Sequence, residues 1–325
     1  MKAVLRFISN WMLPLAILTG ISAYLVFHFT PALYPAGPFL HVLVSKGQPI
    51  LISVMLFLQF VKVSPRDLKV HRWHFKLLFL QGILFIALAL AASQMAPGTA
   101  RILTECAMLC FICPTAAAAG VITDRLGGSM AEIMSYVVMI NCLASLLIPA
   151  MIPLVHPSES FSFWSSFLKI ITRVFSILLL PCVLAWTIRF TLPALQEKLE
   201  KYASWAFYIW GIGLTFAVIL ATRALLLSHI SAGTALLIAL TSLLCCLVQF
   251  GWGRKIARSY GPSESLTSGQ AFGQKNTGFL IWLGYTFLTP VTSVAGGFYS
   301  IWHNIVNSWE LYLRQKEQEK LTSSR

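Results

Sequence analysis

The chain has 325 residues, of which 57% are hydrophobic and 11% are charged, and its formal net charge is +13. A soluble domain carries about 25% charged residues, so this composition excludes an ordinary soluble protein and predicts a polytopic membrane protein. The excess of lysine and arginine would suggest nucleic-acid binding in a soluble protein. In a membrane protein the cytoplasmic loops carry such an excess, so we expect the lipid bilayer and no nucleic acid as a partner.

Ten apolar segments follow one another, each of a length close to the roughly 20 residues that cross a bilayer. They cover approximately residues 11–29, 38–61, 75–94, 102–123, 130–155, 163–192, 203–221, 231–250, 268–288 and 290–312. No small-residue cleavage site follows the first segment, so we expect a retained helix rather than a signal peptide. With ten crossings the basic residues gather on one side, which predicts two cytoplasmic termini, a cytoplasmic tail over 313–325 and a place in a bacterial inner membrane.

The ninth segment contains the polar run Gly273-Gln274-Lys275-Asn276-Thr277-Gly278. A charge at the centre of a membrane costs at least about 2.5–3.5 kcal/mol, so an unbroken lipid-facing helix is a poor place for Lys275. Because glycines flank the run, we expect the helix to be interrupted here. Its freed backbone groups would then face a cavity lined by protein.

The fourth segment contains a second interruption, where Pro114 is followed by small residues as far as Gly120. Proline removes a backbone donor and clashes with the preceding turn of a helix. When ten helices divide into two sets of five, the fourth and ninth correspond, and the second set is inverted. The sequence thus predicts an all-α membrane protein, one unit over 1–325, built from two inverted five-helix repeats with helices 4 and 9 broken.

Broken helices expose amino-terminal N–H groups, which suit an anion, and carboxyl-terminal carbonyls, which suit a cation. Thr115 and Thr277 could supply hydroxyls beside such amino termini and are therefore candidate contacts for an anionic substrate. Asn304 in the tenth segment is a further candidate, although a hydrogen bond between helices is the simpler role for it.

Cys106, Cys110 and Cys113 share one helix face, but no histidine or suitably placed carboxylate completes a metal site there. We interpret them as packing residues and predict neither a metal nor a cofactor.

Three motifs resemble the bile acid/sodium symporter family, which belongs to the same superfamily as the arsenite and auxin carriers. They are Cys113-Pro114 to Thr123, Gly273 to Gly278, and Thr289-Pro290 to Ser308, and the turn at Ser64-Pro65-Arg66-Asp67-Leu68 is also similar. The resemblance implies a panel domain (about 11–61 and 163–221) and a core domain (about 75–155 and 231–312). It further implies that the broken helices 4 and 9 cross, with two sodium ions beside the crossing, an organic anion between the domains, and alternating access. Asn276 matches the family's asparagine next to the crossing, so the resemblance makes it a candidate contact for the substrate.

The sequence departs from the family where sodium would bind. The positions that correspond to sodium ligands fall on Ala119, Gly120 and Ala271, which have no side-chain oxygen, and Lys275 replaces a glutamine. Since sodium needs oxygen ligands, we predict that the Lys275 ammonium replaces a sodium ion. Half-helix carbonyls and Gln81, whose position resembles a family sodium ligand, would hold it. A buried lysine could instead bind and release protons, so a fixed charge and proton coupling both stay open.

The predicted function is secondary active transport of a small organic anion, such as a bile acid-like molecule or a monocarboxylate, without sodium. No arginine clamp is evident in the sequence, which makes a highly charged phosphate substrate less suitable. The alternatives are a true sodium/organic anion symporter and a non-transporting membrane sensor on the same fold. The sequence lacks a nucleophile paired with a base, so we do not expect an enzyme. The sequence specifies neither the substrate, the direction of transport nor the oligomeric state.

Overall fold

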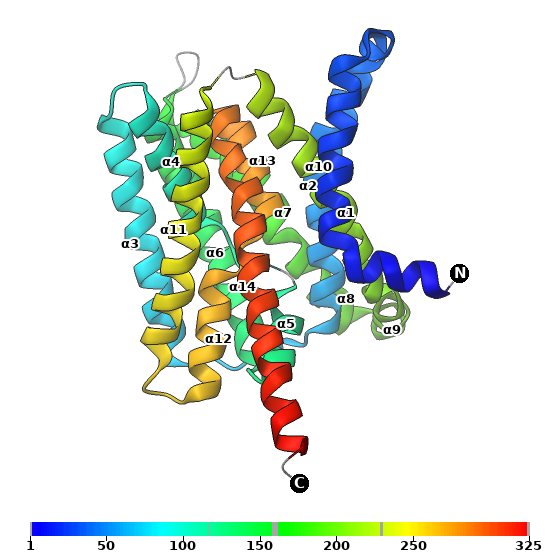
Figure 1. Cartoon of the computed structure of the whole chain (residues 1–325). Helices are drawn as coiled ribbons and strands as arrows, with labels where there is room; N and C mark the ends of the chain where they lie inside the picture. Colours follow the sequence, from blue (N-terminus) through cyan, green and yellow to red (C-terminus); the bar gives the residue numbers. More distant parts are fainter. Residues whose placement is uncertain (1, 117, 158–161, 228–229, 324–325) are drawn as a thin grey trace.

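The computed structural model describes residues 2–116, 118–157, 162–227 and 230–323. This part of the chain is helical and contains no strand, which confirms the predicted all-α class (Figure 1). Short 3-10 turns lie at Pro31–Ala36, Pro65–Asp67 and Ala203–Trp205. The helices are α1 (Lys2–Phe29), α2 (Gly37–Lys62), α3 (Arg72–Gln94), α4 (Thr99–Ile112), α5 (Ala119–Leu126), α6 (Met130–Val155), α7 (Phe163–Leu178), α8 (Leu180–Thr191), α9 (Pro193–Tyr202), α10 (Ala206–Leu227), α11 (Ala232–Ala257), α12 (Pro262–Gly273), α13 (Thr277–Phe287) and α14 (Pro290–Ser323).

Five helices in the described part are long and apolar enough to cross a membrane: α2 with its preceding turn, α3, α6, α10 and α11. The bent pair α7–α8 would be a sixth. Large apolar side chains such as Leu18, Phe79 and Leu244 are 62%, 71% and 63% exposed, as expected of a surface that faces lipid. Together these features indicate an integral membrane protein. Each of the ten apolar segments contains one helix or two consecutive helices, while ten crossings remain a prediction.

The segment 163–192 is not the single helix that its composition predicts. α7 ends at Leu178, α8 begins at Leu180, and the two helices differ in direction by 46°. Pro181 lies in the first turn of α8, where a missing backbone donor is tolerated, and it cannot continue α7. The polar helix α9 follows, and α14 continues without a break to Ser323 through the segment predicted as a tail.

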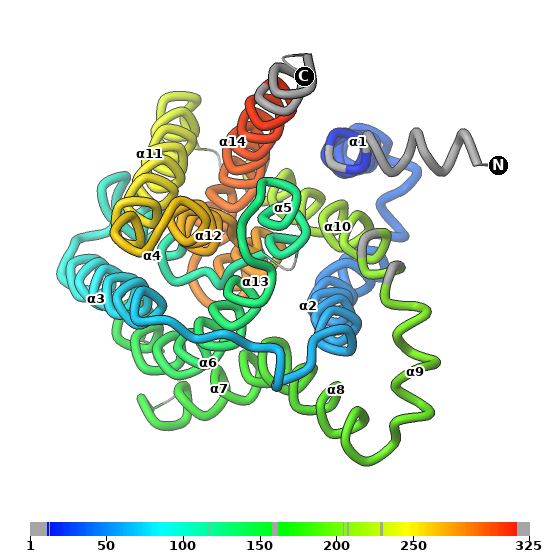
Figure 2. Tube along the Cα trace, turned by 90° about the horizontal axis from the view of Figure 1, so that it is seen from below, coloured from blue at the N-terminus to red at the C-terminus, as the bar shows by residue number. Residues whose placement is uncertain are grey.

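The helices form two groups according to their contacts. α1, α2, α8, α9 and α10 pack on one another, and α3 to α6 pack with α11 to α14. α7 contacts α6 on one side and α2 and α8 on the other. Figure 2 shows the two groups side by side, with α13 between them. The panel prediction (about 11–61 and 163–221) includes α7, which contacts both groups, so the division into panel and core domains stays a prediction.

Two interrupted helix pairs lie in the second group. α4 and α5 are separated by residues 113–118, and α12 and α13 by residues 274–276, so both predicted interruptions are present. The two connecting segments run antiparallel to each other where they cross, at Thr115 and Lys275. The Ala116 N–H donates to the Gln274 carbonyl at 3.1 Å, and the Asn276 N–H donates to the Pro114 carbonyl at 2.8 Å. Backbone groups released by each interruption are thus paired with those of the other.

Candidate functional site

Lys275 lies at the crossing point and is only 1% exposed. Its Nζ is 3.4 Å from the carbonyl oxygen of Phe111, and it lies 5.1 Å from the centre of the Phe272 ring. Its backbone N–H donates to Nδ1 of His303 at 3.3 Å. The ion pairs formed by the described residues lie elsewhere. A helix carbonyl and an aromatic face therefore surround this ammonium in place of a carboxylate.

The carbonyl that Lys275 contacts belongs to the last turn of α4, where helix carbonyls lack intrahelical partners and carry partial negative charge. Gln81 of α3 donates to the same Phe111 oxygen at 2.6 Å and to the Cys113 oxygen at 3.3 Å. The Gln81 carbonyl in turn accepts from the Tyr136 hydroxyl at 2.7 Å. Lys275 and Gln81, which the sequence groups together, thus meet at one shared oxygen atom.

The carboxyl-terminal end of α12 is covered in the same way by side chains from other helices. The Thr115 hydroxyl donates to the Ala271 carbonyl at 2.6 Å, and the Tyr299 hydroxyl donates to the Gly273 carbonyl at 2.8 Å. Gln249 of α11 donates to the Tyr299 oxygen at 3.1 Å and to the Cys110 carbonyl of α4 at 3.3 Å. Protein donors therefore occupy carbonyls at both half-helix ends.

The three positions predicted to have lost sodium ligands also lie in this region. Ala119 and Ala271 are fully buried at the start of α5 and near the end of α12. A Cβ placed on Gly120 would lie 3.4 Å from the Met134 sulfur, so a longer side chain would have to displace Met134. The packing here leaves room for small residues and supplies no side-chain oxygen at these three positions.

Asn276 lies on the opposite side of the crossing from the Lys275 ammonium. Its Oδ1 accepts from the Phe279 N–H at 3.2 Å and so caps the amino terminus of α13. Because this oxygen is engaged, the amide NH₂ is the group that the side chain can offer to a ligand.

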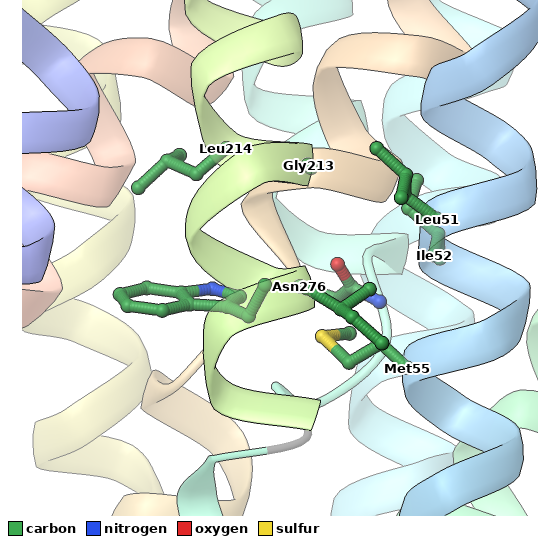
Figure 3. Close-up of a pocket in the computed structure, with 9 residues that line it drawn as sticks. Leu51, Ile52, Met55, Gly213, Leu214 and Asn276 are labelled. Carbon is green, nitrogen blue, oxygen red and sulfur yellow. The ribbon is translucent and has the colours of Figure 1, made fainter. Parts of the chain in front are cut away.

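A small cavity of about 20 Å³ adjoins Asn276 between α2 and α10 (Figure 3). Its other lining residues are Leu51, Ile52 and Met55 from α2, Ile209, Trp210, Gly213 and Leu214 from α10, and Gly278 from α13. This space holds about one water molecule. An organic anion would need the two helix groups to separate here.

Thr277 and Asn304, the remaining predicted substrate contacts, lie in different places. Thr277 is the first residue of α13 and is buried beside the crossing, but it does not line the cavity. Asn304 donates to the Ser300 carbonyl of its own helix at 2.7 Å and is absent from the cavity lining. The structure therefore brings Thr115, Lys275, Asn276 and Thr277 together and leaves Asn304 apart.

Gln48 was not among the residues singled out from the sequence. It is fully buried in α2, and its Nε2 donates to the Gly278 carbonyl of α13 at 2.8 Å. Its Oε1 is buried without a hydrogen-bond partner. A glutamine inside an apolar segment is itself a signal of a functional position, and this signal could have identified Gln48.

No protein-family model and no curated protein matches the chain. Its fold and site define it as an all-helical integral membrane protein in which two interrupted helix pairs cross at a buried lysine.

Proposed function

We propose that the chain is a secondary active carrier of a small organic anion, related to the bile acid/sodium symporters, in which the Lys275 ammonium replaces a sodium ion. One observation carries the proposal. Two consecutive residues at the crossing face opposite helix ends: Lys275 contacts the carbonyl end of α4, and Asn276 caps the N–H end of α13.

The substrate side of this arrangement suits an anion. The amino terminus of α13 carries partial positive charge, and the Asn276 amide adds a hydrogen-bond donor beside it. Apolar side chains from α2 and α10 make up most of the rest of the cavity wall. A ligand with one charged group and an apolar body fits such a wall, which favours a monocarboxylate or a bile acid-like molecule over a phosphate.

The lysine and the occupied carbonyls at the half-helix ends explain why this carrier would not require sodium. Sodium in the related carriers would bring positive charge to the crossing, and the Lys275 ammonium would supply that charge here. The Phe111 oxygen receives both Lys275 and Gln81, and the carbonyls of Ala271 and Gly273 receive hydroxyl donors. A sodium ion would therefore compete with protein donors for the same oxygen atoms.

Alternating access would move α13 and its group against α2 and α10. Gln48 supports this motion, because its single hydrogen bond crosses between the groups while its Oε1 lacks a partner. The cavity beside Asn276 has a volume of only about 20 Å³, so this motion would have to enlarge it before an organic anion could enter.

The proposed topology has ten crossings in two inverted repeats, with cytoplasmic termini, in a bacterial inner membrane. Fourteen of the 24 lysines and arginines lie between Lys62 and Lys76 around the α2–α3 connection, in α5 and α9, between Arg254 and Arg258 before α12, and in α14 from Arg314 onward. These elements lie toward the lower end of Figure 1. Basic residues gathered at one end fit the positive-inside rule.

The direct test is uptake into proteoliposomes containing the purified chain, over a panel of small carboxylates and bile acids. We expect uptake of at least one anion, unchanged when a sodium gradient is replaced by a potassium gradient. A requirement for sodium would favour the sodium symporter, and binding of an anion without flux would favour the sensor.

The variant Lys275→Gln, measured in the same liposomes, tests whether Lys275 acts as a fixed charge or as a carrier of protons. If the variant's uptake responds to a pH gradient as the parent's does, Lys275 does not carry the coupling proton.

A further inference from the structure

A cluster of polar side chains joins the two helix groups away from the crossing. Arg223 of α10 donates through Nη1 to the hydroxyl of Tyr285 in α13, and Nε2 of His41 in α2 lies 3.3 Å from the same hydroxyl. We call His41, Arg223 and Tyr285 the outer cluster. A single phenol oxygen thus connects α2 and α10 of one group to α13 of the other.

Arg223 has an unusual charge environment for a half-buried arginine. Arg101, by comparison, is paired with Glu105 at 2.9 Å and donates to the Val155 carbonyl at 2.6 Å. None of the ion pairs among the described residues includes Arg223. Its acceptor is a neutral phenol, although charged acceptors form hydrogen bonds with arginine about twice as strong as neutral ones. The guanidinium is therefore available for a better acceptor.

The outer cluster lies on the same three helices as the cavity beside Asn276, beyond an apolar layer. The cavity beside Asn276 is bounded by Leu51 to Met55, Ile209 to Leu214, and Gly278. The next turns of the same three helices pack as an apolar layer, made of Val44, Ala217, Leu220, Ala221 and Ile281. One further turn along each helix brings His41, Arg223 and Tyr285. Cavity, apolar layer and outer cluster thus succeed one another along α2, α10 and α13.

We propose that a substrate path runs along α2, α10 and α13, that Arg223 is a second anion-binding position, specific for a carboxylate, at its mouth, and that Tyr285 occupies this position when no carboxylate is bound. The inference rests on the proposed carrier function and extends it to the mouth of the path. A carboxylate accepts two N–H groups from the guanidinium and displaces the phenol hydroxyl. Loss of the Arg223–Tyr285 contact then frees α13 from α10 above the apolar layer.

If a carboxylate displaces Tyr285 from Arg223, two variants should change the affinity for a carboxylate in opposite directions. Arg223→Gln removes the binding group, so affinity for a carboxylate should fall about ten- to a hundredfold, as expected for the loss of a charged hydrogen bond. Tyr285→Phe removes the competing acceptor, so affinity should rise several-fold. If the pair only holds the two helix groups together, both variants should change affinity in the same direction.

The experiment is equilibrium binding of radiolabelled benzoate and cholate to the full chain in phospholipid nanodiscs. Benzamide, which has the shape of benzoate without its charge, should not compete. Arg223→Lys should keep part of the affinity. Arg173→Gln, which removes an exposed arginine of α7, is the matched control and should leave the dissociation constant unchanged.

Three results would overturn the inference: no binding of either carboxylate to the parent protein, equal affinities in the parent and in Arg223→Gln, or a loss of affinity in Tyr285→Phe. Benzoate binding that occurs in maltoside micelles but disappears in phospholipid nanodiscs would assign Arg223 to a lipid phosphate instead.

Uptake measured in parallel keeps the two proposals distinct. Arg223-dependent binding without uptake would contradict the carrier but not the outer site. Uptake with an unchanged KM in Arg223→Gln would contradict the outer site but not the carrier.

Discussion

Gln81 of α3 and Lys275 of the segment between α12 and α13 donate to one atom, the carbonyl oxygen of Phe111. The glutamine alone gives that oxygen a hydrogen bond at 2.6 Å, so the lysine is not needed to satisfy it. The ammonium nevertheless lies in the interior, where an isolated cation is costly to bury. A charge kept at such a cost without a structural need points to function, and this reasoning leads to the first prediction.

We predict that Lys275→Met folds as well as the parent or better and loses transport. Methionine fills a similar volume and removes the cost of burying a charge, while Gln81 still occupies the Phe111 oxygen. The midpoint of thermal unfolding in nanodiscs should stay constant or rise, and anion uptake should fall at least about tenfold. Lys62→Met, at the exposed end of α2, is the control for removal of one positive charge. A large drop in thermal stability would instead make Lys275 a structural residue.

We predict that Asn276→Asp separates helix capping from anion binding. Aspartate caps helices about as well as asparagine, so the thermal stability should change little. Its negative charge faces the cavity where the amide NH₂ was, so anion uptake should be abolished. Asn276→Ala removes the cap as well and should cost about 1 kcal/mol in addition to activity. Retained uptake in the aspartate variant would contradict the assignment of Asn276 to an anion.

Thr115 tests whether the crossing depends on side-chain hydrogen bonds. Its hydroxyl is the donor to the Ala271 carbonyl, and both groups are buried. Thr115→Val keeps the shape and leaves that carbonyl without this donor, which should lower the free energy of unfolding by about 1–3 kcal/mol. Thr115→Ser keeps the hydroxyl and should recover most of this loss. Equal stability of the valine and serine variants, measured by thermal unfolding, would exclude a role for the bond.

Gly253 and Gly251 of α11 are a matched pair of positions that tests how closely α11 packs on α12. A Cβ on Gly253 would lie 2.5 Å from the Ser268 oxygen and 2.9 Å from the Gly269 Cα, both in the backbone of α12. A Cβ on Gly251 would meet nothing within 4 Å. Gly253→Ala should therefore force the helices apart and destabilise the fold, whereas Gly251→Ala should stabilise it slightly because alanine favours helix. Thermal unfolding of the two variants should move in opposite directions.

The sequence predicts the features that depend on local chemistry. Pro114 and the glycines around Lys275 mark both interruptions, and the interruptions occupy matching positions in the two halves of the chain, whereas their crossing is predicted only from the family resemblance. The bend between α7 and α8 was missed because the segment is uniformly apolar, although Pro181 and a length well beyond one crossing were signals of it. α9 was missed because its polar composition shows no apolar period.

Long-range hydrogen bonds lay beyond sequence reasoning. Gln48 and Gly278, which are joined by one hydrogen bond, are 230 residues apart in the chain. Thr115 was predicted to contact substrate, but its hydroxyl is bonded to Ala271, a partner that depends on how the two interruptions align. The residue type indicates that a polar group needs a partner, while only the packing of the helices decides which partner it has.

α13 has 11 residues and is therefore roughly 16 Å long. Asn276 caps one end of it, and Tyr285 lies two turns further along, against Arg223. A helix of this length is stiff, so it tilts or shifts as one piece. In the proposed carrier, an anion that shifts Asn276 would therefore also change the position of Tyr285, so this one short helix would couple the cavity to the outer cluster.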